Sequence, residues 1–187
     1  MKLVLGIGGA TGQPYTARVL DWLASEGRDR GIQLDVVFSK TGRLCWQQEI
    51  GTDPGAYGFK VWSPNDFTAP FASGSARYDG MAVLPCSSGG LGRIAHGLST
   101  DLIGRAADVM LKERRKLVLV LRESPYSLPL IKNLEAVTLA GAVVMPGSPV
   151  FYTNASTASD LIDTVAGRVL DQLGVEDHGL CPRWEGM

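Results

Sequence analysis

Short apolar runs recur along the chain, and polar residues do not interrupt them. The runs cover residues 3–5, 36–38, 81–84, 117–121 and 142–145. Strands that are buried on both faces of a parallel sheet have this pattern, whereas half-exposed strands alternate apolar and polar residues. The chain therefore contains at least five predicted strands that are covered on both faces.

Helical stripes lie between these runs. Their apolar residues recur every three or four positions, which places them on one face of a helix. The stripes are formed by Tyr15, Val19, Trp22 and Leu23, by Leu102, Ala106, Val109 and Met110, and by Leu161, Ile162, Val165, Val169 and Leu173. Pro14 suits the first turn of the first helix. Residues 157–160 (TASD) predict a capping box for the last helix.

Strands that alternate with helices indicate βαβ units. We therefore predict a single three-layer Rossmann-like α/β domain over residues 1–187, with an open, mainly parallel sheet flanked by helices on both faces. Residues 51–79 fit this pattern least, because they are rich in Gly, Pro, Ser and aromatic side chains. A loop of this length in a compact domain is usually functional or part of an interface.

Composition narrows the class of protein. The formal net charge is −1, so the chain has no global basic field that would attract nucleic acid. The three cysteines lack C-x-x-C spacing and indicate free thiols in a reducing cytoplasm. The two histidines are too few for a metal site built from histidine. No apolar run approaches the ~20 residues that a membrane span needs. We expect a cytoplasmic protein without nucleic-acid or membrane partners.

Loops rich in Gly, Ser and Thr follow the predicted strands. They are residues 8–12 (GGATG), 39–40 (SK), 85–90 (PCSSGG), 122–125 (RESP) and 146–152 (PGSPVFY). The carboxyl ends of parallel strands meet at one edge of the sheet, where open α/β domains bind ligands. Backbone N–H groups and hydroxyls at helix starts suit a phosphate. We therefore expect a phosphate-bearing ligand at this edge.

The first loop belongs to a G-x-x-G-x-x-G pattern at residues 6–12, which is typical of dinucleotide sites. An NAD site also needs an acid at the end of the second strand, and that strand ends in Ser39 and Lys40. Asp35 lies at about the expected sequence distance from the glycines, but at the beginning of the second strand and not at its end. Lys40 would suit NADP, so this test is not decisive, yet the missing acid favours a mononucleotide. The glycines would then let that nucleotide approach the backbone.

Cationic side chains form a second group. Arg105 and Lys112 lie two helical turns apart, so they share a face at the edge of an apolar stripe. A single such cation would snorkel along the edge of the core. Two in register, with Arg122 and Glu123 one strand later, indicate an anion site, because desolvated cations are costly without one. Arg168, on the last predicted helix, is a further candidate.

Several segments together resemble the UbiX-type flavin prenyltransferases. They are residues 85–87 (PCS), 105–115 (RAADVMLKERR), 117–119 (LVL), 122–125 (RESP), 149–152 (PVFY) and 180–184 (LCPRW), with 65–66 (ND), 69–70 (AP) and 72–75 (ASGS) in the irregular loop. The likeness runs nearly from end to end. Its most specific part is RAADVMLKERR followed by RESP, whereas the Gly-rich loop alone is not specific.

The resemblance implies an activity. Such enzymes transfer a dimethylallyl group from dimethylallyl phosphate to N5 and C6 of reduced FMN, and UbiD-type decarboxylases use the prenylated FMN. It also implies an FMN-binding, flavoprotein-type Rossmann domain, a homododecamer with active sites shared between subunits, and no metal. The chain lacks an acidic diphosphate–Mg²⁺ motif, which agrees, because cations alone can hold a monophosphate.

The resemblance also assigns residues. Those implied to hold FMN are Gly9, Ala10, Thr11, Ser39, Ser87, Ser88, Gly89, Gly90 and Arg122. Those implied to surround dimethylallyl phosphate are Arg105, Lys112, Tyr152, Arg168, Phe67 and Trp184. Catalysis is assigned to Glu49, near the reacting flavin, and to Lys112, Glu123 and Arg105. The C-terminal segment, residues 176–187, would cover the active site.

These residue types suit the chemistry. Breaking the allylic C–O bond develops charge on the phosphate, which the three cations of the donor site would stabilise. Tyr152 would donate a hydrogen bond to that phosphate, and Glu123 would pass a proton to or from it. The released phosphate, oriented by Glu123, is a base for the C6 proton. Phe67 and Trp184 would shield an allyl cation with their π faces.

Three residues depart from the family pattern. Thr11 stands where Ser is usual, Phe67 where Trp is common and Gly90 where Thr often occurs. None of these changes removes a charge from the donor site. We therefore expect them to alter flavin affinity and donor preference more than the type of reaction.

Three other interpretations remain. An FMN-dependent cysteine-type decarboxylase shares the fold but carries a P-A-S-A-N-T-like segment and a His after the second strand, where this chain has PCSSG (85–89) and SKTGR (39–43). A non-catalytic FMN-binding subunit of a decarboxylase complex would not need Glu49, Lys112, Glu123, Tyr152 and Arg168 together. An NAD(P)-dependent reductase is disfavoured because no acid stands at the end of the second strand and because the chain lacks a Tyr-x-x-x-Lys pair.

Overall fold

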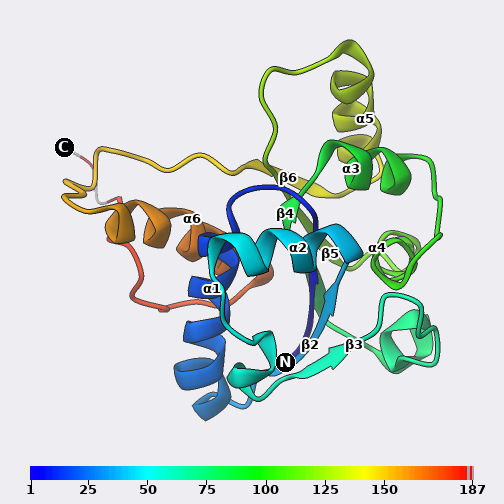
Figure 1. Ribbon diagram of the computed structural model, residues 1–187, viewed down its shortest axis with the longest axis horizontal. Helices are drawn as coiled ribbons and strands as arrows, with labels where there is room; N and C mark the ends of the chain where they lie inside the picture. The colour runs from blue at the N-terminus through cyan, green and yellow to red at the C-terminus, as the bar shows by residue number, and fades with distance from the viewer. Residues whose placement is uncertain (185, 187) are drawn as a thin grey trace.

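Six parallel strands form one sheet in the part of the chain that the computed structural model describes, residues 1–184 and 186. Their order is β3-β2-β1-β4-β5-β6 (Figure 1). The strands are β1 (Lys2–Ile7), β2 (Gln33–Phe38), β3 (Lys60–Trp62), β4 (Gly80–Cys86), β5 (Lys116–Leu121) and β6 (Val143–Pro146). The helices are α1 (Gln13–Trp22), α2 (Lys40–Glu49), α3 (Ser88–Ala95), α4 (Leu102–Lys112), α5 (Leu128–Leu139) and α6 (Ala158–Leu173).

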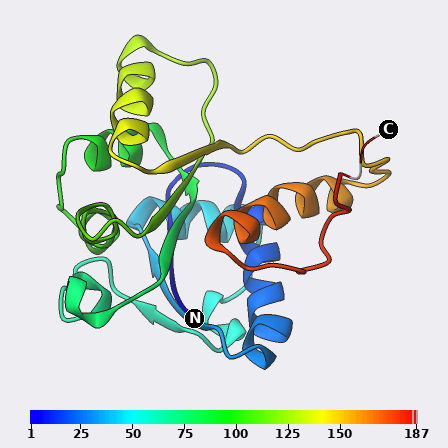
Figure 2. The same ribbon diagram turned by 180° about the vertical axis from the view of Figure 1, so that it is seen from behind.

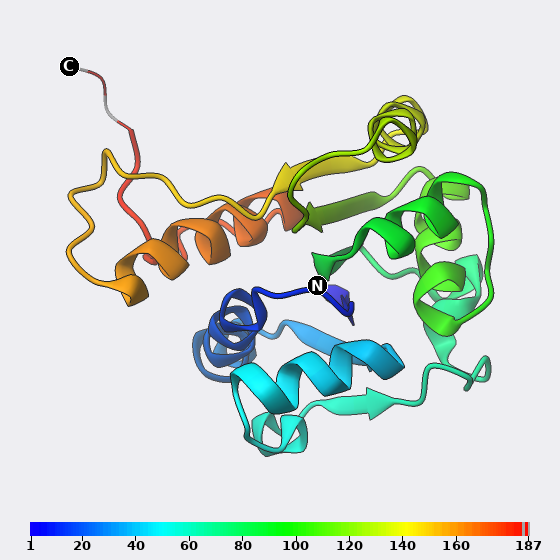
Figure 3. The same ribbon diagram turned by 45° about the horizontal axis from the view of Figure 1, so that its top comes forward.

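Two apolar cores lie on opposite faces of this sheet. Helices α3, α4 and α5 cover one face, and α1, α2 and α6 cover the other (Figures 1 and 3). On β5, Leu117 and Leu119 belong to the first core, whereas Val118 and Val120 belong to the second. Both faces of the central strands are therefore buried, which explains their uninterrupted apolar runs. The predicted three-layer α/β fold is confirmed.

The strand order reverses between β1 and β4, because β1 pairs with β2 on one side and with β4 on the other. Such a switch point leaves a crevice beyond the carboxyl ends of the strands. The Ser39 backbone N–H donates to the Ile7 carbonyl at 2.9 Å, and the Gly8 N–H donates to the Pro85 carbonyl at 3.1 Å. These bonds hold the loops after β1, β2 and β4 side by side.

The structure differs from the sequence prediction at the two edge strands, β3 and β6. The run that forms β6 was expected to be covered on both faces, and that is wrong, because Val143 is 36% exposed. The three-residue strand β3 lies inside the segment that was predicted to be a loop. A strand this short shows no usable periodicity. Which strand lies at the edge depends on the order of the whole sheet, and local patterns do not contain it.

Helices α3 and α5 were also not predicted. The α3 sequence, SGGLGRIA, holds three glycines, which are poor helix formers. Helix α5 leaves Leu128, Ile131 and Leu139 exposed, so its apolar residues do not form a single buried stripe. In contrast, the capping box at α6 is confirmed, because Thr157 and Asp160 exchange side-chain-to-backbone hydrogen bonds.

The chain after α6 returns along the outside of α6 and α1 (Figure 2). The indole N–H of Trp22, on α1, donates to the His178 carbonyl at 2.9 Å. Of the segment predicted to cover the active site, Glu185 and Met187 lie outside the described residues. Among residues 1–184 and 186, no helix has the length and apolar character to cross a membrane.

Candidate active site

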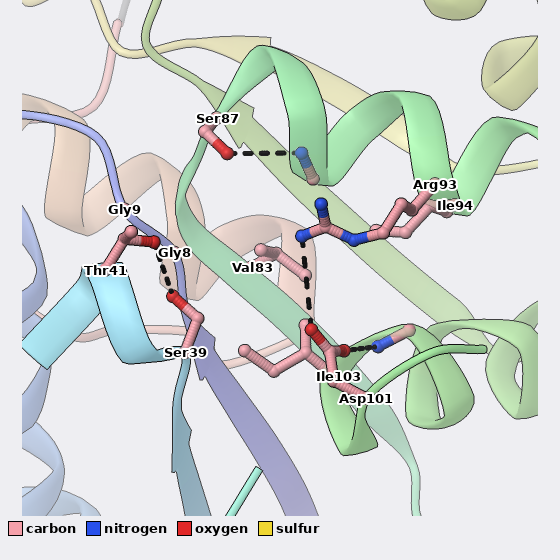
Figure 4. Close-up of a pocket in the computed structure, with 12 residues that line it drawn as sticks. Gly8, Gly9, Ser39, Thr41, Val83, Ser87, Arg93, Ile94, Asp101 and Ile103 are labelled. Carbon is pink, nitrogen blue, oxygen red and sulfur yellow. Dashed lines mark hydrogen bonds and ion pairs between the residues drawn. The ribbon is translucent and has the colours of Figure 1, made fainter. Parts of the chain in front are cut away.

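A cavity opens at the switch point of the sheet (Figure 4). It is lined by Gly8, Gly9, Ser39, Thr41, Val83, Ser87, Gly90, Arg93, Ile94, Asp101, Ile103 and Gly104. Three helices begin at this cavity, and a side chain caps each of them by accepting a backbone N–H. Ser39 accepts from Gly42 (2.9 Å), Ser87 from Gly90 (3.1 Å) and Asp101 from Gly104 (2.8 Å). Helix N-termini and hydroxyls together suit an anionic group such as a phosphate.

The glycines of the first loop are required by contacts within the protein. A Cβ at Gly8 would lie 2.5 Å from the Pro85 carbonyl oxygen, and a Cβ at Gly9 would overlap the Thr41 side chain. The sequence had suggested that these glycines let a nucleotide approach the backbone. The structure gives another reason, since the loops after β1, β2 and β4 pack too closely for any side chain there.

The predicted FMN residues gather around this cavity. Gly9, Ser39, Ser87 and Gly90 line it. Ala10 and Thr11 follow Gly9 in the same loop, and Ser88 and Gly89 form the first turn of α3. The Arg122 backbone N–H donates to the Cys86 carbonyl at 3.1 Å, which joins the loop after β5 to the loop after β4.

Arg93 and Asp101 also line the cavity, and the sequence analysis did not select them. The Arg93 Nη2 atom lies 4.0 Å from Asp101 Oδ2, across the space between α3 and α4 (Figure 4). Arg93 and Ile94 lie three and four residues after Gly90, so both are neighbours of Gly90 on the surface of α3. A helix that begins after Ser87 would have indicated from the sequence that Arg93 lies near Gly90. The sequence analysis did not recognise α3 as a helix, so it missed Arg93.

Cys86 lies at the end of β4 and is fully buried. Burial raises the pKa of its thiol to about 12. A thiol with so high a pKa is a poor nucleophile at neutral pH. Cys86 is therefore a small packing residue at the end of β4.

Glu49 is the last residue of α2 and reaches the beginning of α1. Its Oε2 atom accepts the backbone N–H groups of Gly12 at 3.0 Å and Gln13 at 2.9 Å. Gly12, the N-cap of α1, supplies no side-chain cap. The carboxylate therefore caps α1 from another helix and lies at the loop that borders the cavity.

The cations of α4 lie beside residues 69–76 of the irregular segment. Arg105 Nε donates to the Ala72 carbonyl at 3.0 Å, and its Nη1 pairs with Asp108 at 2.9 Å. Lys112 Nζ pairs with the Glu113 carboxylate at 2.5 Å, which holds the pKa of Glu113 below its usual range. Both side chains share the predicted helix face, and each has a carboxylate neighbour.

Two further pockets hold other predicted site residues. Arg122 and Glu123 line a pocket of about 780 Å³ between the loops that follow β5 and β6. Tyr152, Arg168 and Trp184 line another, of about 740 Å³, beside α6. There the Tyr152 and Trp184 rings meet edge to face, with centroids 5.6 Å apart. We call the second of these the α6 pocket.

One chain thus holds the predicted site residues in separate groups. The predicted FMN residues other than Arg122 lie at or beside the switch-point cavity, whereas the α4 cations, the pair after β5 and the α6 pocket lie on other elements. Phe67 is 47% exposed in the loop after β3. Whether these groups meet around one substrate stays a prediction.

Comparison with known proteins places this fold and cavity in a class. The sequence model of the Flavoprotein family matches residues 1–170, so the chain is a member of the flavoprotein class. The chain is 38% identical to flavin prenyltransferase UbiX of Streptomyces coelicolor, over all of this chain and 96% of the relative. It belongs to the UbiX family of flavin prenyltransferases, and the resemblance seen in the motifs is confirmed.

Two solved structures have the same architecture. AnUbiX (PadA1), in complex with FMN and dimethylallyl pyrophosphate, has a TM-score of 0.92 and 42% identity, and the match covers 100% of this chain and 98% of that one. A dodecameric FMN-dependent UbiX-like decarboxylase from Escherichia coli O157:H7 has a TM-score of 0.93 and 39% identity over the full length of both chains.

Proposed function

We propose that this chain is a flavin prenyltransferase that moves a dimethylallyl group from dimethylallyl phosphate to N5 and C6 of reduced FMN. The observation that carries the proposal is the switch-point cavity, in a chain that belongs to the UbiX family. Hydroxyls and helix N-termini at Ser39 and Ser87 suit the FMN phosphate. Val83, Ile94 and Ile103 supply an apolar wall that suits a flavin ring. Reduced FMN, when bound, supplies the atoms that are alkylated.

The cations of the chain stabilise the leaving phosphate. Arg105, Lys112 and Arg168 each keep N–H donors beyond those used on their carboxylate neighbours, so each can also bind a phosphate oxygen. Charge that develops on the phosphate as the C–O bond breaks is stabilised by such donors when they are held in place beforehand. This cationic set is our basis for proposing a monophosphate donor and no metal.

Proton transfer falls to Glu123, and Tyr152 orients the phosphate. The hydroxyl of Tyr152, which is 64% exposed, donates a hydrogen bond to a phosphate oxygen. Glu123 holds the proton that the phosphate gains or loses. Glu49 stands at the loop that borders the cavity, and we assign its carboxylate to the flavin side of the site. Trp184 and Phe67 cover the allyl group.

We propose that the complete site forms between copies of the chain. The α4 cations, the residues after β5 and the α6 pocket are separate in one chain, whereas the reaction needs them around one phosphate. Large apolar side chains stay exposed at and beside the α6 pocket, among them Phe151 (73%) and Trp184 (61%). The dodecameric E. coli relative supports a closed homo-oligomer of this kind.

The product is a modified cofactor, and we propose that a UbiD-type decarboxylase uses it in the cytoplasm. The alternative is a non-catalytic FMN-binding subunit of a decarboxylase complex. Such a subunit would keep the switch-point cavity but would have no use for the cations of the donor site. Prenylation activity distinguishes the transferase from the binding subunit.

The test is anaerobic incubation of the full chain with reduced FMN and dimethylallyl phosphate, followed by mass spectrometry of the flavin. We expect the mass of one dimethylallyl unit to be added, and the addition to be lost in Lys112→Ala and Glu123→Ala. Glu26→Ala, an exposed acid in the helical turn that follows α1, is the control and should leave the product unchanged. Unmodified FMN from a folded, FMN-binding wild type would favour the binding subunit. A parallel reaction with dimethylallyl diphosphate tests the choice of donor.

A further inference from the structure

Asp171, on the last turn of α6, joins that helix to the C-terminal segment. Its side chain is 10% exposed and has three partners. Oδ2 accepts from Arg168 Nη1 at 2.7 Å, and Oδ1 accepts from Arg183 Nη1 at 2.6 Å and from His178 Nε2 at 3.1 Å. One carboxylate therefore orients an arginine of α6 and an arginine of the segment that follows it.

His178 connects Asp171 to the backbone of the C-terminal segment through its two ring nitrogens. The side chain of His178 is 1% exposed, and its Nδ1 atom accepts the backbone N–H of Leu180 at 3.1 Å. The proton of the neutral imidazole therefore lies on Nε2, which donates to Asp171. Both ring nitrogens are satisfied, as a buried imidazole requires.

Several further contacts hold the C-terminal segment in this position. Two N–H groups of Arg30 donate to the carbonyls of Glu176 and Asp177, at 2.9 and 3.0 Å. A Cβ at Gly167 would lie 2.7 Å from the His178 ring and 3.0 Å from the Cys181 sulfur. The segment therefore lies directly on the backbone of α6, close enough to require glycine there. Its end is held at the α6 pocket, where Trp184 packs on Tyr152.

The charges of this cluster favour an anion in the α6 pocket. Asp171, Arg168 and Arg183 all line it, and the two guanidinium groups exceed the single carboxylate by one positive charge. Their side chains are 52% and 51% exposed, so both keep N–H groups free to meet a ligand. An arginine that is held on one side by a carboxylate presents its other donors in a fixed direction, which suits a phosphate.

We infer that Asp171 is a positioning residue of the donor-phosphate site, and that Arg183 is a second cation of that site beside Arg168. This inference rests on the proposed function, because that function identifies the anion as the phosphate of the prenyl donor. Asp171 does not touch the donor. It fixes both arginines and ties the segment that carries Trp184 to α6.

Asp171→Asn tests the inference, because it keeps the size of the side chain and removes its charge. We expect KM for dimethylallyl phosphate to rise about tenfold, which corresponds to about 1.4 kcal/mol of binding. We expect kcat to fall as well, because a displaced Arg168 stabilises the leaving phosphate less, and the affinity for FMN to stay near wild type. Amide hydrogen exchange at Leu180 should speed up, because its acceptor on His178 loses its anchor. The matched control is Asp163→Asn on the same helix, which loses an ion pair with Arg18 outside the α6 pocket.

A binding measurement separates this inference from the proposed function. Calorimetric titration of the FMN-loaded full chain with inorganic phosphate needs no turnover. Weaker binding in Asp171→Asn than in Asp163→Asn would support the inference even if the wild type transfers no prenyl group. Equal phosphate affinities and equal KM values in these two variants would overturn it. If Asp171→Asn does not fold, Arg183→Gln, at an exposed side chain, replaces it, and an unchanged phosphate affinity there has the same meaning.

Discussion

Glu49 caps a helix to which it does not belong, because its carboxylate accepts the backbone N–H of Gly12 at 3.0 Å, 37 residues away in sequence. This contact gives Glu49 a structural role in addition to the catalytic role that the family resemblance assigns to it. The two roles differ in what they require, since a cap needs only an acceptor oxygen, whereas catalysis at the flavin needs a charged carboxylate.

Glu49→Gln and Glu49→Ala should therefore differ. Glutamine keeps an acceptor oxygen for Gly12 and Gln13, so its thermal stability should stay near wild type. Alanine loses the cap and should cost about 1 kcal/mol of unfolding free energy. If Glu49 also acts at the flavin, both variants should lose at least about tenfold in kcat. Full prenylation activity in a stable Glu49→Gln enzyme would leave only the capping role.

Arg93→Gln should weaken FMN binding. The guanidinium lies in the switch-point cavity 4.0 Å from Asp101, where it would meet an anionic group of the cofactor. Loss of a charge-assisted contact predicts a Kd for FMN about tenfold higher in fluorescence titration. Riboflavin, which lacks the phosphate, should bind wild type and variant alike if Arg93 faces the phosphate. Arg43→Gln, on α2 and outside the cavity lining, is the control, and an equal FMN affinity in Arg93→Gln would refute the contact.

Sequence patterns predicted those parts of the fold that depend on near neighbours. The apolar runs of the central strands, the Thr157 cap and the stripe of α4 are local, and each was confirmed. The edge positions of β3 and β6 depend on the order of the whole sheet. No local pattern contains that order, so β6 was wrongly expected to be covered on both faces.

The candidate site also has parts that the sequence predicted and parts that it did not. Loops at the ends of β1, β2 and β4 were predicted to converge because parallel topology requires it, and they do. Contacts between distant elements were missed, such as Glu49 with Gly12 and Arg93 with Asp101. These depend on how helices lie against one another, which one-dimensional spacing does not determine.

Gly8→Ala should destabilise the protein even without FMN. The added Cβ would lie 2.5 Å from the Pro85 carbonyl oxygen, so the loops after β1 and β4 must separate. Such overpacking typically costs about 1–3 kcal/mol. Gly89→Ala is the matched control in the first turn of α3, where the nearest atom would be Arg93 Nη1 at 3.8 Å. Thermal unfolding of the FMN-free proteins measures the difference, and equal melting temperatures would show that the loops can separate freely.

Asp171 should make part of the stability depend on pH. Burial opposes its ionisation, but hydrogen bonds from Arg183, Arg168 and His178 outweigh this and hold the pKa of Asp171 below its usual range. A lowered pKa in the folded state contributes stability above the unfolded-state value of about 4, and this contribution is lost as pH falls through the folded-state pKa. Wild type should therefore exceed Asp171→Asn in melting temperature at pH 6, and the gap should narrow as pH falls toward 3. A gap that does not change with pH would mean that the charge of Asp171 does not stabilise the fold.

Two inactive variants should restore activity to each other if the site lies between subunits. Lys112→Ala damages the α4 group and Arg168→Ala damages the α6 pocket, and each alone should abolish prenylation. In mixed oligomers, some sites take their α4 group from one variant and their α6 pocket from the other, so those sites are intact. Random mixing predicts activity in about a quarter of the sites. Co-expression of two differently tagged variants, tandem purification and the flavin mass assay measure the recovery. A site built within one chain would give none, because every chain carries a lesion in its own site.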